Sequence, residues 1–172
     1  DATEGATRAV VVGASFIGME AASSLSARGL SVTVVGREAV PFEAVLGADV
    51  GRVFQQAADA KGVTFRLGVD VQTIERGADG ALAVTLSDGT SAAGDVVLVG
   101  VGVTPATAFL DGQPFRRDDG GLATDATLRL ADGLFAAGDV AAFPEARSGQ
   151  TVRIEHWRLA QQHGRTAARN LI

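Results

Sequence analysis

Three residues near the start of this 172-residue sequence have the types and spacing of a nucleotide-binding turn. Gly13, Ser15 and Gly18 follow the dinucleotide fingerprint, except that serine replaces the middle glycine. In such a turn the first glycine permits a tight bend, the middle residue lets a pyrophosphate approach the backbone, and the last glycine allows close helix packing. The amides of the first helical turn then face the anion. The predicted binding turn comprises Gly13, Ala14, Ser15, Phe16, Ile17 and Gly18.

The elements on either side of this turn are those that a nucleotide site requires. Residues 10–12 are a β-branched run that predicts a strand, and residues 16–28 carry apolar side chains at helical spacing until Gly29. A second β-branched run at residues 31–35 predicts another strand. This order is typical of one βαβ unit. The alternative is that the glycines serve only close packing of the strand against the helix.

A second candidate for nucleotide contact lies at the end of the second predicted strand, about 20 residues after the glycines, where a ribose-binding acid is expected. This position holds Gly36, Arg37 and Glu38. Arginine offers forked donors to a 2′-phosphate, which favours NADPH or a relaxed choice, whereas Glu38 would accept hydrogen bonds from the 2′-hydroxyl of NADH. The alternative is that Arg37 and Glu38 form a solvated pair at a strand end.

The segments after Glu38 predict the rest of an α/β domain. Residues 39–47 are expected to be a loop because Pro41 disfavours helix, residues 45–57 to be a helix ending by Gly62, and residues 63–67 to be a strand. Residues 70–93 predict an antiparallel meander, with hairpin turns at Asp79-Gly80 and Asp88-Gly89.

A third candidate for ligand contact follows a nearly all-apolar segment, residues 95–100, which predicts a strand buried on both faces. The loop at its carboxyl end contains Gly100, Val101 and Gly102, in the position where ligands bind to open α/β sheets. The alternative is that these glycines are simple turn residues.

The last third of the chain is organised more loosely. Residues 111–133 are rich in Asp, Gly and Arg and are expected to cross between domains, and residues 134–140 predict a short buried strand. Residues 153–172 predict a closing helix. Its expected apolar side carries Leu159, Ala160, Ala167, Ala168 and Leu171.

The composition excludes several classes of function. The net charge is −5 and there is no basic block, which argues against nucleic-acid binding. Cysteine is absent, which excludes disulfides, cysteine metal sites and a redox cysteine pair within this sequence, and with two histidines we expect no metal site. No apolar run is long enough to span a membrane and no leader opens the sequence, so we expect a soluble, cytoplasmic protein.

Four motifs in order give the sequence a family resemblance over nearly its whole length: VVVGASFIGMEAA, DVVLVGVGVTPAT, GLFAAGDVAAFP and RIEHWRLAQQHGRTAARNL. They resemble the FAD-dependent pyridine nucleotide-disulfide oxidoreductases, in particular the apoptosis-inducing-factor-like and ferredoxin reductase branch. The resemblance implies a Rossmann-like parallel sheet with a β-meander in residues 1–103, forming an NAD(P)H domain. Residues 104–172 would be the returning part of an FAD domain, whose N-terminal half, like the C-terminal interface domain, is absent from this sequence.

The resemblance also implies roles for individual residues. Residues 13–18 would hold the NAD(P)H pyrophosphate and residues 100–102 would border the nicotinamide. Glu20 would lie near the carboxamide, although it could also be a first-turn acid stabilised by the helix dipole. Further residues are implied to contact the flavin, namely Gly138, Asp139, Val140, Glu155, His156 and Trp157. On the residues alone, Asp139 could be a helix N-cap, His156 a structural residue and Trp157 a core or interface aromatic.

The implied chemistry is hydride transfer from NAD(P)H to FAD, with no catalytic side chain, followed by electron transfer to an iron–sulfur protein, either a ferredoxin or a Rieske domain. A homodimer is left open. The first alternative is a non-catalytic NAD(P)H-binding module. The second is a redox-sensing protein in which the cofactor state controls self-association.

Overall fold

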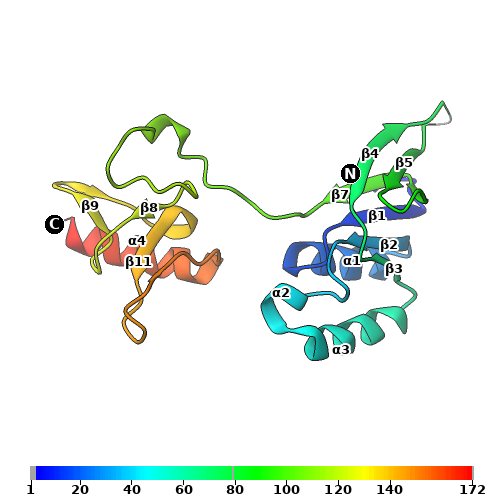
Figure 1. Cartoon of the computed structure of the whole chain (residues 1–172), viewed down its shortest axis with the longest axis horizontal. Coiled ribbons are helices and arrows are strands. Elements are labelled where there is room, and N and C mark those ends of the chain that lie inside the picture. The colour runs from blue at the N-terminus through cyan, green and yellow to red at the C-terminus, as the bar shows by residue number, and fades with distance from the viewer. Residues whose placement is uncertain (1–2, 79, 172) are drawn as a thin grey trace. The chain divides into compact units, whose positions relative to one another are not determined.

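The structure, a computed structural model, describes residues 3–78 and 80–171. The chain divides into two compact units, Asp1–Gly102 and Val103–Ile172, which are described separately below as unit 1 and unit 2 (Figure 1). Within the described residues, no helix has the length and apolar composition needed to cross a membrane.

Unit 1 is built on a four-stranded parallel sheet in the order β3-β2-β1-β7. The strands are β1 (Arg8–Val12), β2 (Ser31–Gly36), β3 (Thr64–Leu67) and β7 (Val96–Val99), and the helices are α1 (Phe16–Ala27), α2 (Glu43–Leu46) and α3 (Ala48–Asp59). The predicted strand, turn, helix and strand of residues 10–35 are confirmed. The α/β class is confirmed as well.

The central strand β1 is buried on both faces, and its side chains divide between two cores. Ala9 and Val11 pack on the side that α1 covers, with Met19, Ala22 and Leu25. The alternate residues Val10 and Val12 pack against a meander of three strands on the opposite side (Figure 1). A strand covered on both faces has no polar side, which explains the uninterrupted apolar run in the sequence.

The meander consists of β4 (Val71–Arg76), β5 (Leu82–Leu86) and β6 (Ser91–Gly94), paired antiparallel in that order. At the second hairpin Gly89 has φ of 80°, and the Thr90 amide and hydroxyl both donate to the Asp88 carboxylate, at 2.9 and 2.7 Å. The predicted meander and this turn are confirmed. In the first predicted turn, Asp79 lies outside the described residues.

Three expectations for unit 1 are wrong. The segment expected to be a loop contains α2, because Pro41 precedes the helix and therefore removes no hydrogen bond from it. The helix expected over residues 45–57 is interrupted at Gly47, which has φ of 79°, and α3 begins after it. The strand expected to be buried on both faces over residues 95–100 is β7, which lies at the edge of the sheet and is only half-buried, with the Val99 residue 56% exposed.

Unit 2 contains short strands and one long helix. The strands are β8 (Leu122–Ala123), β9 (Arg129–Ala131), β10 (Leu134–Phe135), β11 (Ala141–Pro144) and β12 (Thr151–Val152), and the helical segments are η1 (Ala108–Leu110), η2 (Gly138–Val140) and α4 (Trp157–Asn170). Strand β11 pairs parallel with β8 and antiparallel with β12, while β9 pairs with β10. The core contains Leu122, Leu128, Ala136 and Ala141.

Two expectations for unit 2 also require correction. The buried strand expected over residues 134–140 is limited to β10, where Leu134 is exposed, and residues 138–140 form η2. The closing helix begins at Trp157, and Ile172 lies outside the described residues. The packed side of α4 includes the buried His163, whereas Ala168 and Leu171 are exposed. The face of the helix that packs on unit 2 is therefore rotated from the expected apolar face.

Candidate functional site

A cavity of about 550 Å³ lies at the carboxyl ends of the parallel strands of unit 1. Segments that follow β1, β2, β3 and β7 all contribute to its wall. This is the edge of an open α/β sheet at which ligands bind. The predicted site residues in the wall are Gly13, Ala14, Ser15, Gly36, Arg37, Glu38, Gly100, Val101 and Gly102.

The turn between β1 and α1, which lines the cavity, is possible only with glycine at position 13. Gly13 has φ of 110°, and a Cβ atom there would lie 2.2 Å from the carbonyl oxygen of Gly100. The Gly13 amide donates to the Val35 carbonyl and the Gly100 amide donates to the Val12 carbonyl, each at 2.7 Å. The two glycine loops are therefore packed backbone to backbone, which leaves room for a ligand to approach the main chain.

Helix α1 starts at this turn with an N-terminus suited to an anion. A Cβ atom on Gly18 would lie 1.9 Å from the Gly13 carbonyl oxygen, so the helix approaches the turn closely only because residue 18 has no side chain. Ser15 is the N-cap residue, but its side chain makes no capping hydrogen bond, and the first turn contains no acidic residue. Amides of the first turn have no acceptor within the helix, so they can donate to a phosphate at the positive end of the dipole.

Charged side chains gather at the part of the wall that follows β2 and β3. The Arg37 guanidinium donates from Nε to the Asp70 carboxylate, and Glu38 lines the same cavity. Arg37 pairs with Asp70 rather than with Glu38, and the alternative that Arg37 and Glu38 are solvated residues at a strand end stays a prediction. Gly36 allows the segment to pass close to Ala14, since a Cβ atom on it would lie 3.0 Å from the Ala14 Cβ atom.

Four predicted residues of α1 do not line this cavity. Phe16 and Glu20 line a second cavity of about 420 Å³, whose wall comes mainly from α1 and α3. Glu20 lies beyond the first turn of α1, so its interpretation as a first-turn acid is wrong. Ile17 is exposed, and Gly18 is buried against the Gly13 carbonyl.

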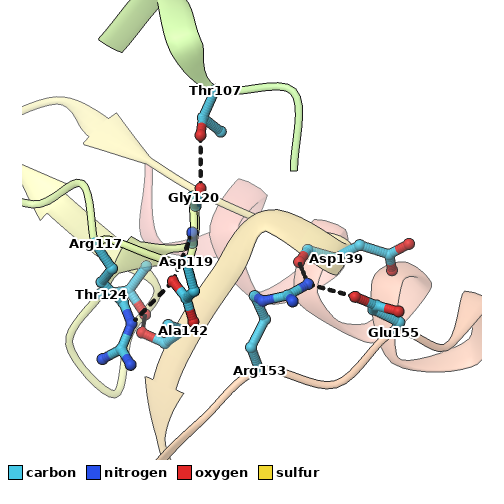
Figure 2. A network of polar contacts seen from close by, with 10 residues as sticks. Thr107, Arg117, Asp119, Gly120, Thr124, Asp139, Ala142, Arg153 and Glu155 are labelled. Atoms are coloured by element: carbon cyan, nitrogen blue, oxygen red, sulfur yellow. Dashed lines mark hydrogen bonds and ion pairs between the residues drawn. The ribbon is translucent and has the colours of Figure 1, made fainter. Parts of the chain in front are cut away.

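The first group of flavin-side candidates in unit 2 lies in the loop that contains η2, and the backbone of this loop is held by hydrogen bonds to side chains. The Gly138 amide donates to Nδ1 of His163 at 3.3 Å, and the Asp139 carbonyl accepts from Nη1 of Arg153 at 3.1 Å. The same Arg153 atom donates to Glu155 at 2.6 Å, and the Asp139 carboxylate points away from Arg153 (Figure 2). Asp139 is not an N-cap, since Ala137 occupies that position of η2.

The second group lies at the start of α4. His156 is the N-cap of this helix, and its Nδ1 accepts from the Arg158 amide at 3.1 Å, which is a structural role. Trp157 is 64% exposed, so it is not a core aromatic. Its ring lies 6.0 Å from the His156 ring, and the Arg158 guanidinium lies 5.4 Å from its centroid.

Comparison with known proteins decides the family. Residues 1–164 match the pyridine nucleotide-disulphide oxidoreductase family. The chain belongs to this family. Its members use FAD and NAD(P)H.

Individual relatives place the chain near the reductases of this family. It is 38% identical to human apoptosis-inducing factor 3 over an alignment of 167 residues, which covers 95% of the chain and 27% of that protein. It is 30% identical to a ferredoxin reductase from Rhodopseudomonas palustris, with a TM-score of 0.89, covering 98% of the chain and 42% of that structure. It is 28% identical to the reductase in a covalent putidaredoxin reductase–putidaredoxin complex, with a TM-score of 0.86, covering 94% of the chain and 39% of that structure.

Sequence reasoning missed several residues that the structure makes prominent. Asp70 lines the cavity, and its position just after β3 is a usable signal, because the ends of neighbouring parallel strands meet at one edge. Arg153 and His163 hold the loop at residues 138–139, and their sequence neighbours gave no sign of this. His163 is buried, and this burial lowers its pKa, so the ring that accepts from Gly138 is neutral.

Proposed function

We propose that the intact protein is an NAD(P)H-dependent flavoprotein reductase. Residues 1–103 would form its NAD(P)H domain and residues 104–172 part of its FAD domain. Electrons would pass on to an iron–sulfur protein, either a ferredoxin or a Rieske domain. The observation that carries the proposal is the cavity at the carboxyl edge of the parallel sheet, together with membership of a family that uses FAD and NAD(P)H.

The residues of unit 1 fit a dinucleotide. The turn at Gly13 and the packing of Gly18 leave no space for a side chain, and the amides that follow can donate to the pyrophosphate. Residues 36–38 would contact the adenosine ribose, and residues 100–102 would border the nicotinamide. The volume of the cavity lies within the range typical of ligand sites, about 300–1,000 Å³.

The residues of unit 2 have groups that fit a flavin. The Asp139 carboxylate is exposed while its backbone is held by Arg153, so it can accept hydrogen bonds from ribityl hydroxyls without moving the loop. The Val140 amide would lie close to it. The exposed ring of Trp157 offers an aromatic face to the flavin ring, with its indole nitrogen as a donor.

When both cofactors are bound, the nicotinamide supplies a hydride and the flavin accepts it, so the chain need not supply a nucleophile or an acid. Residues of unit 1 would hold and orient the nicotinamide nucleotide, and residues of unit 2 would hold the flavin. An iron–sulfur acceptor is supported by the similarity to a ferredoxin reductase and to a reductase captured with putidaredoxin.

The binding site can be tested with a substitution that leaves the helix intact. Ser15→Asp places a carboxylate at the N-terminus of α1, which favours the helix but repels a pyrophosphate. We expect calorimetric titration of the chain to show NADH and NADPH affinity at least about tenfold weaker than in the unchanged chain. Ser24→Asp, at an exposed position of the same helix, is the matched control and should bind as the unchanged chain does. Equal binding by the Ser15 and Ser24 variants would contradict the placement of the pyrophosphate.

The redox function is tested by the visible spectrum of the chain after incubation with FAD and removal of unbound FAD, before and after anaerobic addition of NADH or NADPH. A yellow protein that bleaches supports the reductase. A colourless chain that binds nucleotide would support the alternative of a non-catalytic NAD(P)H-binding module.

A further inference from the structure

Asp70 is an acidic residue in the wall of the nucleotide cavity that the dinucleotide fingerprint does not include. It lies in the link between β3 and β4, and its carboxylate faces the Arg37 guanidinium, which follows β2. The contact joins residues from neighbouring parallel strands at the carboxyl edge of the sheet. Asp70 therefore lies where the adenosine ribose is expected under the proposed function.

The carboxylate of Asp70 is not needed to hold its own loop. The Asp70 amide donates to the Ser87 hydroxyl at 3.0 Å, and the Ser87 amide donates to the Asp70 carbonyl at 2.8 Å. The main chain is thus anchored to the meander on both sides of the residue. The side chain remains 56% exposed and makes its ion pair with an Arg37 side chain that is 81% exposed. Exposed ion pairs of this kind contribute little to the free energy of unfolding, so the Arg37–Asp70 pair is not required for stability and can serve ligand choice.

The pair changes what Arg37 can offer to a nucleotide. A guanidinium recognises a phosphate best through two parallel N–H groups, and because the Nε group of Arg37 is already donated to Asp70, only its Nη groups remain for a phosphate. Arg37 contributes one positive charge to this part of the cavity, while Glu38 and Asp70 contribute two negative charges. The three side chains together are therefore negative, which opposes a 2′-phosphate and suits a 2′-hydroxyl that donates to a carboxylate.

We infer that Asp70 is a specificity-determining residue that makes this site prefer NADH to NADPH by occupying and neutralising Arg37. The inference rests on the proposed function, because it requires the nucleotide to lie in this cavity. It assigns the preference to the partner of the arginine rather than to the arginine itself. A site with Arg37 but without the Asp70 carboxylate would accept the 2′-phosphate.

The test is a calorimetric titration of the chain with NADH and with NADPH, in the unchanged protein and in Asp70→Asn. Asparagine keeps the size of the side chain and removes its charge. We expect the ratio of NADPH affinity to NADH affinity to rise about threefold to tenfold, since one negative charge is removed from near a doubly charged phosphate. Raising the salt concentration should reduce the gain, whereas an effect on loop structure alone would not depend on salt.

Two further variants make the result specific. Asp132→Asn removes the carboxylate of another arginine–aspartate pair, Arg129–Asp132 in unit 2, and should leave the ratio unchanged. In an Arg37→Gln background the Asp70→Asn gain should shrink, because the guanidinium that it frees is no longer present. An equal gain in both backgrounds would overturn the coupling between the two residues.

The remaining outcomes separate this inference from the proposed function. An unchanged chain that binds both nucleotides but prefers NADPH, or an Asp70→Asn variant with an unaltered ratio, would overturn the inference and leave the nucleotide site in place. A folded chain that binds neither nucleotide would overturn the proposed function, and the inference with it.

Discussion

Replacing Gly18 with alanine should destabilise unit 1, although alanine is the better helix former. Gly18 lies in α1, and the added Cβ atom would lie 1.9 Å from the Gly13 carbonyl oxygen and 2.8 Å from its carbon. A backbone carbonyl cannot rotate away as a side chain can, so the helix or the turn must shift. Overpacking of this kind costs about 1–3 kcal/mol, and the gain from helix propensity is at most about 1 kcal/mol. Because the contact is with backbone at 1.9 Å, we take the upper end of the overpacking cost, about 3 kcal/mol, so the expected net loss in the free energy of unfolding is about 2 kcal/mol.

The matched control is the same substitution in a helix where nothing opposes it. Gly164 lies in the interior of α4, and a Cβ atom there has no neighbour within 4 Å. Gly164→Ala should therefore stabilise its unit by about 0.5–1 kcal/mol. If the same glycine-to-alanine change lowers the free energy of unfolding at position 18 and raises it at position 164, the contact with Gly13 is identified as the cause.

Hydrogen-exchange mass spectrometry measures both effects, because it follows peptides from α1 and α4 separately. Protection of α1 and β1 should fall roughly thirtyfold in Gly18→Ala, which is what a loss of about 2 kcal/mol means. Protection of α4 should rise about twofold to fivefold in Gly164→Ala. Unchanged or greater protection of α1 in Gly18→Ala, with the control behaving as expected, would refute the steric reasoning.

Two further predictions concern pH. Hydrogen bonds from the Thr7 amide, the Arg8 side chain and the Thr7 hydroxyl hold the pKa of Asp95 well below its usual range. The stability that the Asp95 carboxylate contributes is therefore present above its unfolded pKa of about 3.9 and is lost as the pH falls. In urea unfolding between pH 5 and 2, the free energy of unfolding should fall less in Asp95→Asn than in the unchanged chain. Burial lowers the pKa of His163, so below about pH 6.5 the unfolded chain binds a proton that the folded chain does not. The free energy of unfolding should therefore fall as the pH is lowered through this range, and it should fall less steeply in His163→Gln. Unfolding can be followed by Trp157 fluorescence. Equal pH slopes in the two proteins would contradict the lowered pKa of His163.

Much of unit 1 could be predicted because its signals are local. The apolar run of β1, the turn at Gly13 and the turn at Asp88-Gly89 each depend on residues adjacent in the sequence. Periodicity and turn preference act over a few residues, so a sequence reports them directly. The error at α2 has the same origin, since the effect of Pro41 depends on which side of a helix it lies.

The α/β class, the order of elements and the glycine-rich turns that border the cavity all follow from the sequence alone. Three features became visible only in the folded chain: Arg37 pairs with Asp70, Glu20 lines a different cavity, and His163 is buried behind the loop at residues 138–139. The physical reason is that these contacts join residues far apart in the sequence. Which side chains meet depends on strand order and helix packing, and burial depends on what covers a surface. Neither is encoded in the spacing of neighbouring residues.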